Sequence, residues 1–294
     1  MLCSLAAAAA DEPACATPGR WLDPVSGEPI ALDQLMASLA ERQIVLLGEI
    51  HEKPEHHRWQ THVLAALQAH RPALVVGFEM FPRSVQPALD GWWRGALSEA
   101  AFLEQSRWER VWGMDPALYW PLFHFVRQNR VPMVALNVER RLVARVAREG
   151  WAAVPESERE DLSAPAAAPD AYRRSLARIF WEQHDGEPRT GPLDIEAVLQ
   201  RDDFARFVEA QLTWDRAMAE ALAEARWEHP EALVVGIIGS GHLRFGHGVP
   251  HQLADLGLTD VAVLLPLEAG AACDTLPSDI ADAVFLLEPA DSGR

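Results

Sequence analysis

The sequence is poor in cysteine, in basic residues and in long apolar runs. Its three cysteines, Cys3, Cys15 and Cys273, are odd in number and none stands in a CxxC pair, so we expect neither a disulfide framework nor a zinc knuckle. No run of about 18 apolar residues is present, which excludes a membrane-spanning helix. Basic residues number 26 against 43 acidic ones, for a net charge of −17. This balance excludes nucleic acid as a partner, because phosphate binding needs clustered Lys and Arg.

The N-terminal residues 1–17 have the character of a signal-like leader. They contain an alanine-rich apolar stretch with an A-x-A-like site at residues 8–10, which is typical of the end of an export signal. The stretch is short and no basic segment precedes it, so an alanine-rich leader without function is the alternative. We therefore expect an exported protein. A lipid anchor on Cys3 or Cys15 stays open, although the residues before Cys15 fit a lipidation motif poorly.

Six short apolar runs predict the strands of a buried sheet. They are continuous rather than alternating, as expected for strands covered on both faces, and each ends in a polar or small residue. Helical patterns lie between them, so we expect an α/β fold with a mostly parallel sheet flanked by helices. The runs occupy residues 43–48, 73–79, 131–137, 232–241, 260–267 and 283–289, and the helical patterns 32–39, 54–68, 117–128 and 204–225.

Residues 141–205 interrupt this alternation. They contain no convincing strand and carry the turn-rich stretch SAPAAAPD at 163–170. We therefore predict an α/β core made of residues 18–140 and 206–294, with residues 141–205 as a smaller helical insertion. Residues 18–32, punctuated by Pro and Gly, are expected to form a loop that leads into the core.

Ionisable side chains follow several of the predicted strands. Glu49 and His51 come after the first, Glu79 and Asn137 close the second and third, and His242 follows the fourth. Because the carboxyl ends of parallel strands meet at one edge of the sheet, we expect these side chains to converge in a site. Buried carboxylates must be paired, hydrated or bound to a cation.

Structural roles stay open for the same residues. Glu49 could cap the helix that starts at Pro54, and Glu79 could pair with Arg83. The histidines taken singly are more often structural than catalytic. Of His56 and His57 we expect one to face the site and the other to be solvated.

The segment SRWERVWGMDPALYWPLFHF, residues 106–125, is rich in aromatic residues. Core packing explains most of them. The functional alternative is a flat apolar surface for a large planar ligand, to which Trp112 would contribute. Tyr119 and His124 would then be the nearby groups able to reach a metal centre.

Six blocks in order resemble one known family, the ChaN-like haem-binding uptake proteins or iron-regulated lipoproteins of the Tiki/TraB/erythromycin-esterase superfamily. The blocks are LLGEIHEKPEHHRWQ, GFEMFPRSVQP, RWERVWGMDPALYWPLFHFVR, VPMVALNVERRLV, QLTWDRAMAEAL and GIIGSGHLRFGHGVP, and they span residues 21–265. The resemblance implies an α/β core, periplasmic or membrane-attached placement, and haem bound in a homodimer with tyrosine as the iron ligand. Carried onto this chain, the ligand would be Tyr119, with His124 or a partner's histidine as the second ligand.

The same superfamily also implies an enzymatic alternative. Relatives such as the Tiki metalloproteases use a GxxH motif and glutamates with a divalent metal, and residues 48–51 and 239–242 both match GxxH. In this alternative His51, Glu79 and His242 would hold zinc or manganese, and Glu49 would act as general base in a metal-dependent esterase or peptidase. A metal-free esterase with a histidine base also stays open.

Overall fold

A single sheet of eight strands forms the centre of the molecule. The structure is a computed structural model that describes residues 15, 17–183, 192–270 and 276–289. The strand order is β2-β1-β8-β7-β3-β6-β4-β5. All pairs from β8 to β5 are parallel, and at the other end β1 pairs antiparallel with both β8 and β2. The strands are β1 (Trp21–Leu22), β2 (Pro29–Ile30), β3 (Ile44–Glu49), β4 (Leu74–Pro82), β5 (Met133–Asn137), β6 (Leu233–Gly239), β7 (Val261–Glu268) and β8 (Ala283–Leu287).

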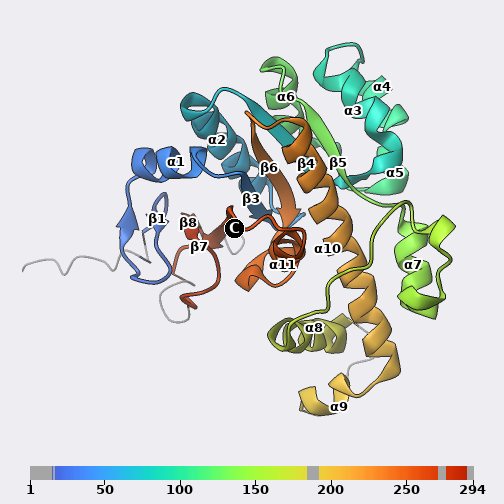
Figure 1. Cartoon of the computed structure of the whole chain (residues 1–294). Helices are drawn as coiled ribbons and strands as arrows, with labels where there is room; N and C mark the ends of the chain where they lie inside the picture. The colour runs from blue at the N-terminus through green and yellow to red at the C-terminus, as the bar shows by residue number, and fades with distance from the viewer. Residues whose placement is uncertain (1–14, 16, 184–191, 271–275, 290–294) are drawn as a thin grey trace, which may run out of the picture.

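Helices cover both faces of the sheet (Figure 1), and as a result every residue of the central strands β3, β4 and β6 is buried. On one face Val45 and Leu47 pack with Trp59, Leu64 and other apolar side chains of the first helices. Ile44 and Leu46, which alternate with them along β3, face the other side of the sheet and pack against the later helices. The first group is α1 (Leu32–Ala40), α2 (Pro54–His70), α3 (Gln86–Trp93), α4 (Glu99–Gln105), α5 (Trp108–Val111) and α6 (Trp120–Gln128); the second is α10 (Asp202–Glu228) and α11 (Val249–Asp255).

Helix α10 is long enough to serve two parts of the molecule. At 27 residues it spans about 40 Å, and its C-terminal half covers the sheet. Its N-terminal half extends beyond the sheet and carries α7 (Arg140–Glu149), α8 (Asp170–Gln183) and α9 (Ile195–Leu199) (Figure 1). Two small apolar clusters hold this part together, one between α7 and α10 and one among α8, α9 and α10. The division into a core and an insertion at residues 141–205 stays a prediction.

The α/β class and the parallel sheet are confirmed. Each of the six predicted strands is present within a few residues of its expected bounds, and β4 runs on to Pro82. The prediction of a simple loop over residues 18–32 was wrong, because two short strands form there and β1 pairs with the edge strand β8. Such two-residue strands depend on a neighbour distant in sequence and leave no periodic pattern.

The N-terminal predictions fall mainly outside the described residues, since only Cys15 and Thr17 of the predicted leader belong to them. Cys15 is disulfide-bonded, which the odd cysteine count did not lead us to expect. A sulfur atom in a disulfide cannot carry a lipid, so Cys15 is not a lipid anchor in this structure. Within the described ranges no helix is both long enough and apolar enough to cross a membrane.

Candidate functional site

The predicted strand ends meet at one edge of the sheet. Glu49 closes β3 and lies in register with Gly239, the last residue of β6. Glu79 reaches this point from β4, where its Oε2 accepts a 2.5 Å hydrogen bond from the Gly239 backbone N–H. Asn137, at the end of β5, donates from its Nδ2 to the Glu79 carbonyl over 3.2 Å. The structure thus brings together Glu49, His51, Glu79, Asn137 and His242, as parallel strands require.

Glu49 is a fully buried carboxylate held by two imidazoles. Its Oε1 lies 2.5 Å from His51 Nδ1 and its Oε2 lies 2.9 Å from His57 Nε2. Burial alone would raise the pKa of Glu49, but the hydrogen bonds from the two histidines outweigh it and hold this pKa below its ordinary value. For His51 burial would lower the pKa, and the bond to Glu49 instead raises it. The pair therefore favours an ionised Glu49 that accepts a hydrogen bond from the Nδ1–H of His51.

The two histidines in the first turn of α2 differ from the sequence prediction. His56 and His57 are both buried, rather than one facing the site and the other being solvated. His57 binds Glu49, whereas His56 Nδ1 accepts a 3.0 Å hydrogen bond from the Ile50 N–H. Burial lowers the pKa of His56 to about 4, so this ring is neutral and shapes the turn after β3.

The imidazole of His242 lies between two carboxylates. Its Nδ1 is 2.6 Å from Asp215 Oδ1, and its Nε2 is 3.8 Å from Glu79 Oε1. Asp215 also accepts a 2.9 Å hydrogen bond from the Tyr172 hydroxyl. Burial would lower the pKa of His242, but Asp215 outweighs it and raises the value to about 9. His242 is therefore charged at neutral pH. Arg83, considered as a partner for Glu79, pairs with Glu220 at 3.6 Å.

Three of these side chains form a group that could hold a metal ion. Single donor atoms of Glu49, His51 and Glu79 all lie within 4.8 Å of one another. The sequence prediction instead combined His51, Glu79 and His242, with Glu49 as general base. In the structure one nitrogen of His242 is engaged by Asp215. Carboxylate and imidazole donors suit a divalent transition metal, so the donor chemistry fits zinc or manganese.

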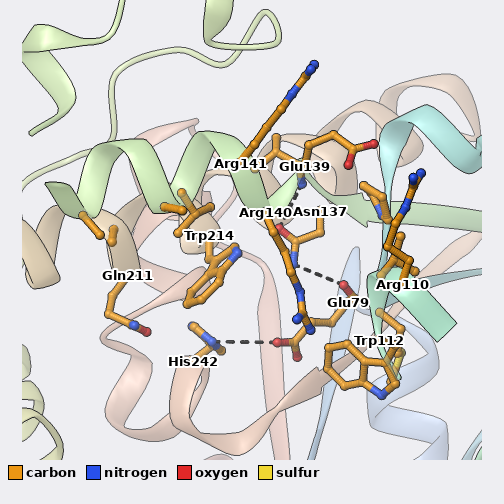
Figure 2. Close-up of a pocket in the computed structure, with 18 of the residues that line it drawn as sticks. Glu79, Arg110, Trp112, Asn137, Glu139, Arg140, Arg141, Gln211, Trp214 and His242 are labelled. Carbon is orange, nitrogen blue, oxygen red and sulfur yellow. Dashed lines mark hydrogen bonds and ion pairs between the residues drawn. The ribbon is translucent and has the colours of Figure 1, made fainter. Parts of the chain in front are cut away.

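Four of the strand-end residues, His51, Glu79, Asn137 and His242, line the floor of a large cavity, part of which Figure 2 shows. Its volume is about 740 Å³, within the range of about 300–1,000 Å³ typical of ligand sites. The walls come from β4, the segment after α5, and helices α7 and α10, and they are largely apolar. They consist of Met80, Pro82, Val111, Trp112, Met114, Val138, Val143, Ala144, Ala147, Phe207, Ala210 and Trp214.

Arginines give the cavity a basic side. Arg110, Arg140 and Arg141 line it, and Arg140 points down toward the Glu79 and His242 end, whereas Arg141 points outward (Figure 2). Arg140 and Arg141 occupy the first turn of α7, where the helix dipole disfavours positive charge. Within the described part of the chain, no carboxylate lies within 4.0 Å of a nitrogen of Arg110 or Arg140. These charges are thus available to an anionic ligand.

The three aromatic-segment residues predicted to bind haem occupy different places. Trp112 lines the cavity and its ring meets the His51 ring at a centroid distance of 4.7 Å and an angle of 75°. Tyr119 does not line the cavity; it is fully buried behind this wall, with its ring 4.2 Å from that of His57. His124 lies on α6, half-exposed, with its Nε2 3.3 Å from Glu99 Oε1. The structure brings Trp112 into the site and leaves the other two outside it.

Several residues at the site escaped the sequence reasoning. They are Asp215, Trp214 and the arginines of the first turn of α7. Asp215 carried a usable signal, because it is an acidic residue on the stripe formed by Leu212, Met218 and Leu222. The others have no local signature, since each reaches the site through packing between distant segments.

Comparison with known proteins identifies relatives by sequence pattern and by fold. The pattern of the family described as haem-binding uptake, Tiki superfamily, ChaN matches residues 35–253. No curated protein matches the chain. Among solved structures, the one described as cofacial heme binding to ChaN of Campylobacter jejuni is similar with a TM-score of 0.68 and 19% identity, covering 92% of this chain and 97% of that one.

Two further structures are more distant. The type III effector HopBA1 has a TM-score of 0.49 and 12% identity, covering 87% of this chain and 93% of that one. A mutant of erythromycin esterase EreC has a TM-score of 0.48 and 12% identity, covering 93% and 84%. Neither score is high enough to carry an argument. The family pattern, however, spans well over half of the sequence, and this chain belongs to the ChaN family of haem-binding uptake proteins in the Tiki superfamily.

Proposed function

We propose that this chain binds haem in the cavity above the strand ends and serves iron or haem uptake. One observation carries the proposal: an apolar cavity of about 740 Å³ has imidazoles on its floor and arginines along one side. Haem is a large flat apolar ring with an iron centre and two carboxylates. Its ring suits the walls from Trp112 to Trp214, its iron the imidazoles, and its carboxylates the arginines. The residues present therefore fit the group that the family implies.

A titration of purified protein with haemin tests this proposal. We expect a saturable Soret band, with haem bound in a fixed ratio to the chain. Ala147 lines the cavity from α7, so Ala147→Trp fills part of the space and should abolish binding at the same haemin concentration. Ala65→Trp is the matched control, because Ala65 is exposed on α2, away from the cavity. Equal binding by both variants would exclude the cavity as the haem site.

We propose further that the protein works in an oxidising compartment outside the cytoplasm. The disulfide at Cys15 supports this placement, because disulfides persist in secreted and periplasmic proteins and are rare in the cytosol. The signal-like leader supports it independently. Cell fractionation, with thiol labelling of the protein before and after reduction, tests the placement. A fully reduced protein in the cytosolic fraction would contradict it.

A homodimer is the arrangement that we propose for the haem-bound state. The solved ChaN structure from Campylobacter jejuni is described as binding heme cofacially, and two facing haems need two binding surfaces. Sedimentation of the protein with and without haemin tests this. We expect a dimer that carries two haems, whereas a haem-loaded monomer would contradict it.

The metal-dependent hydrolase is a second candidate, which we rank below haem binding. Its supporting observation is the group of donor atoms from Glu49, His51 and Glu79 within 4.8 Å. Elemental analysis should then find near-stoichiometric zinc or manganese that is lost in His51→Ala, and metal-loaded protein should cleave a member of an ester and peptide panel. Metal-free protein of unchanged stability would exclude this candidate.

A further inference from the structure

Neither tyrosine of this chain reaches the cavity. The chain has only two, Tyr119 and Tyr172. Tyr119 is 0% exposed, and its hydroxyl lies in the core, with a weak 3.9 Å hydrogen bond to the Met114 sulfur. Tyr172 is buried under α10 and its hydroxyl donates to Asp215 over 2.9 Å. Burial is the main cause that raises the pKa of both phenols, and iron coordination by tyrosine requires the phenolate. Both side chains are thus poorly placed to serve as iron ligands.

His51, in contrast, presents a free nitrogen to the cavity. Its side chain is 35% exposed and lines the cavity beside Trp112. The 2.5 Å contact from its Nδ1 to Glu49 fixes the ring orientation and leaves Nε2 as the free nitrogen. Metal-bound histidines commonly use this arrangement, in which a carboxylate holds the other ring nitrogen and increases the basicity of the ligand.

The surroundings of His51 favour it over His242. The free nitrogen of His242 lies 3.8 Å from Glu79 Oε1, and its side chain is only 15% exposed. On the His51 side, Gly239 leaves room for the ring: a Cβ at that position would lie 3.0 Å from His51 Cε1. The Trp112 ring also contacts the His51 ring edge-on. His51 is therefore both held in place and open toward the ligand.

We infer that His51 Nε2 is the protein ligand to the haem iron in this chain, in place of Tyr119. This inference rests on the proposed haem binding in the cavity and names its iron-ligating residue. Tyr119 instead belongs to the wall that supports His57 and, through it, Glu49.

Spectroscopy of the haemin-loaded protein distinguishes the two ligands. We expect the ferrous form to show an iron–histidine stretching band in resonance Raman spectra, and the ferric form to lack a phenolate charge-transfer band. The histidine band should disappear in His51→Ala and return when free imidazole is added to that variant. Return of the band also shows that His51→Ala is folded. His62→Ala, an exposed change on α2, should keep the band.

Each other outcome overturns a specific part of the argument. A phenolate band that disappears in Tyr119→Phe would overturn the inference and leave haem binding intact. Loss of the histidine band in His242→Ala, but not in His51→Ala, would assign the iron to His242 and overturn the choice of His51. A wild-type protein with no saturable Soret band would refute the proposed function itself.

Discussion

His242 Nδ1 lies 2.6 Å from Oδ1 of Asp215, a residue of α10 that comes 27 positions earlier in the chain. Asp215 is fully buried and receives a second hydrogen bond from Tyr172. One carboxylate on α10 therefore ties the turn after β6 to helix α8. Three segments distant in sequence therefore meet at the His242 end of the cavity floor.

This pair makes the stability of the protein depend on pH. The pKa of His242 is raised from 6.5 to about 9 in the folded state, so its charged form stabilises the fold below pH 6.5, and this contribution is lost as the pH rises through about 9. The difference corresponds to at most about 3 kcal/mol of unfolding free energy. We expect urea denaturation between pH about 6 and about 10 to show a steeper loss in the wild type than in His242→Gln. Equal slopes in the two proteins would contradict the raised pKa, and His62→Gln controls for substitution of a histidine.

The two tyrosines allow a matched test of the Asp215 contact. Tyr172→Phe removes a hydrogen bond to a buried carboxylate, which typically contributes about 1.5–3 kcal/mol. Tyr119→Phe removes a weak 3.9 Å contact with the Met114 sulfur and no bond to a charged group, so it should cost less than about 1 kcal/mol. Denaturant unfolding of both variants measures the difference. If Tyr119→Phe proved the more destabilising of the two, the Tyr172–Asp215 contact would not be a main support of the site.

The convergence of the strand-end residues was predictable because sheet geometry is general. Once six buried apolar runs indicate a parallel sheet, Glu49, Glu79 and His242 must approach the same edge. The partners of these residues were not predictable. Asp215 meets His242 only because α10 crosses behind β6, and nothing in the local sequence indicates this crossing. Likewise, the aromatic spacing around Tyr119 cannot reveal which rings face the cavity and which face the core.

Gly239 and Gly241 form a matched pair for testing the position of His51. A Cβ at residue 239 would lie 3.0 Å from His51 Cε1 and 3.4 Å from Glu79 Oε2, so Gly239→Ala must displace the ring by a few tenths of an ångström. Such a displacement costs about 0.5–1.5 kcal/mol, which corresponds to an increase of about 2- to 10-fold in the haem dissociation constant. A Cβ at residue 241 would meet nothing within 4 Å, so Gly241→Ala should bind haem as the wild type does. Soret titration measures the haem affinity of both variants. Equal affinities would show that the position of the His51 ring does not affect haem binding.

Replacing Arg140, in the first turn of α7, should change protein stability and haem binding in opposite directions. Arg140 lies in the first turn, where the helix dipole disfavours a positive charge, so Arg140→Gln should raise the unfolding free energy by about 0.3–1 kcal/mol. The same change should weaken haem binding about 2- to 5-fold, because one exposed ion pair with a haem carboxylate contributes up to about 1 kcal/mol. Arg148 is exposed in the last turn of α7 and does not line the cavity. Arg148→Gln should therefore lower stability slightly and leave haem binding unchanged.

Haem dimethyl ester lacks the two carboxylates of haem. It therefore distinguishes ion pairing between Arg140 and the ligand from a change in the shape of the cavity. If Arg140 binds a carboxylate, wild type and Arg140→Gln should bind the ester with equal affinity and differ only with haem itself. The difference with haem should also shrink as salt is added, because the arginine is exposed to solvent. An equal loss of affinity for haem and for its ester would show that Arg140 shapes the cavity rather than pairing with the ligand.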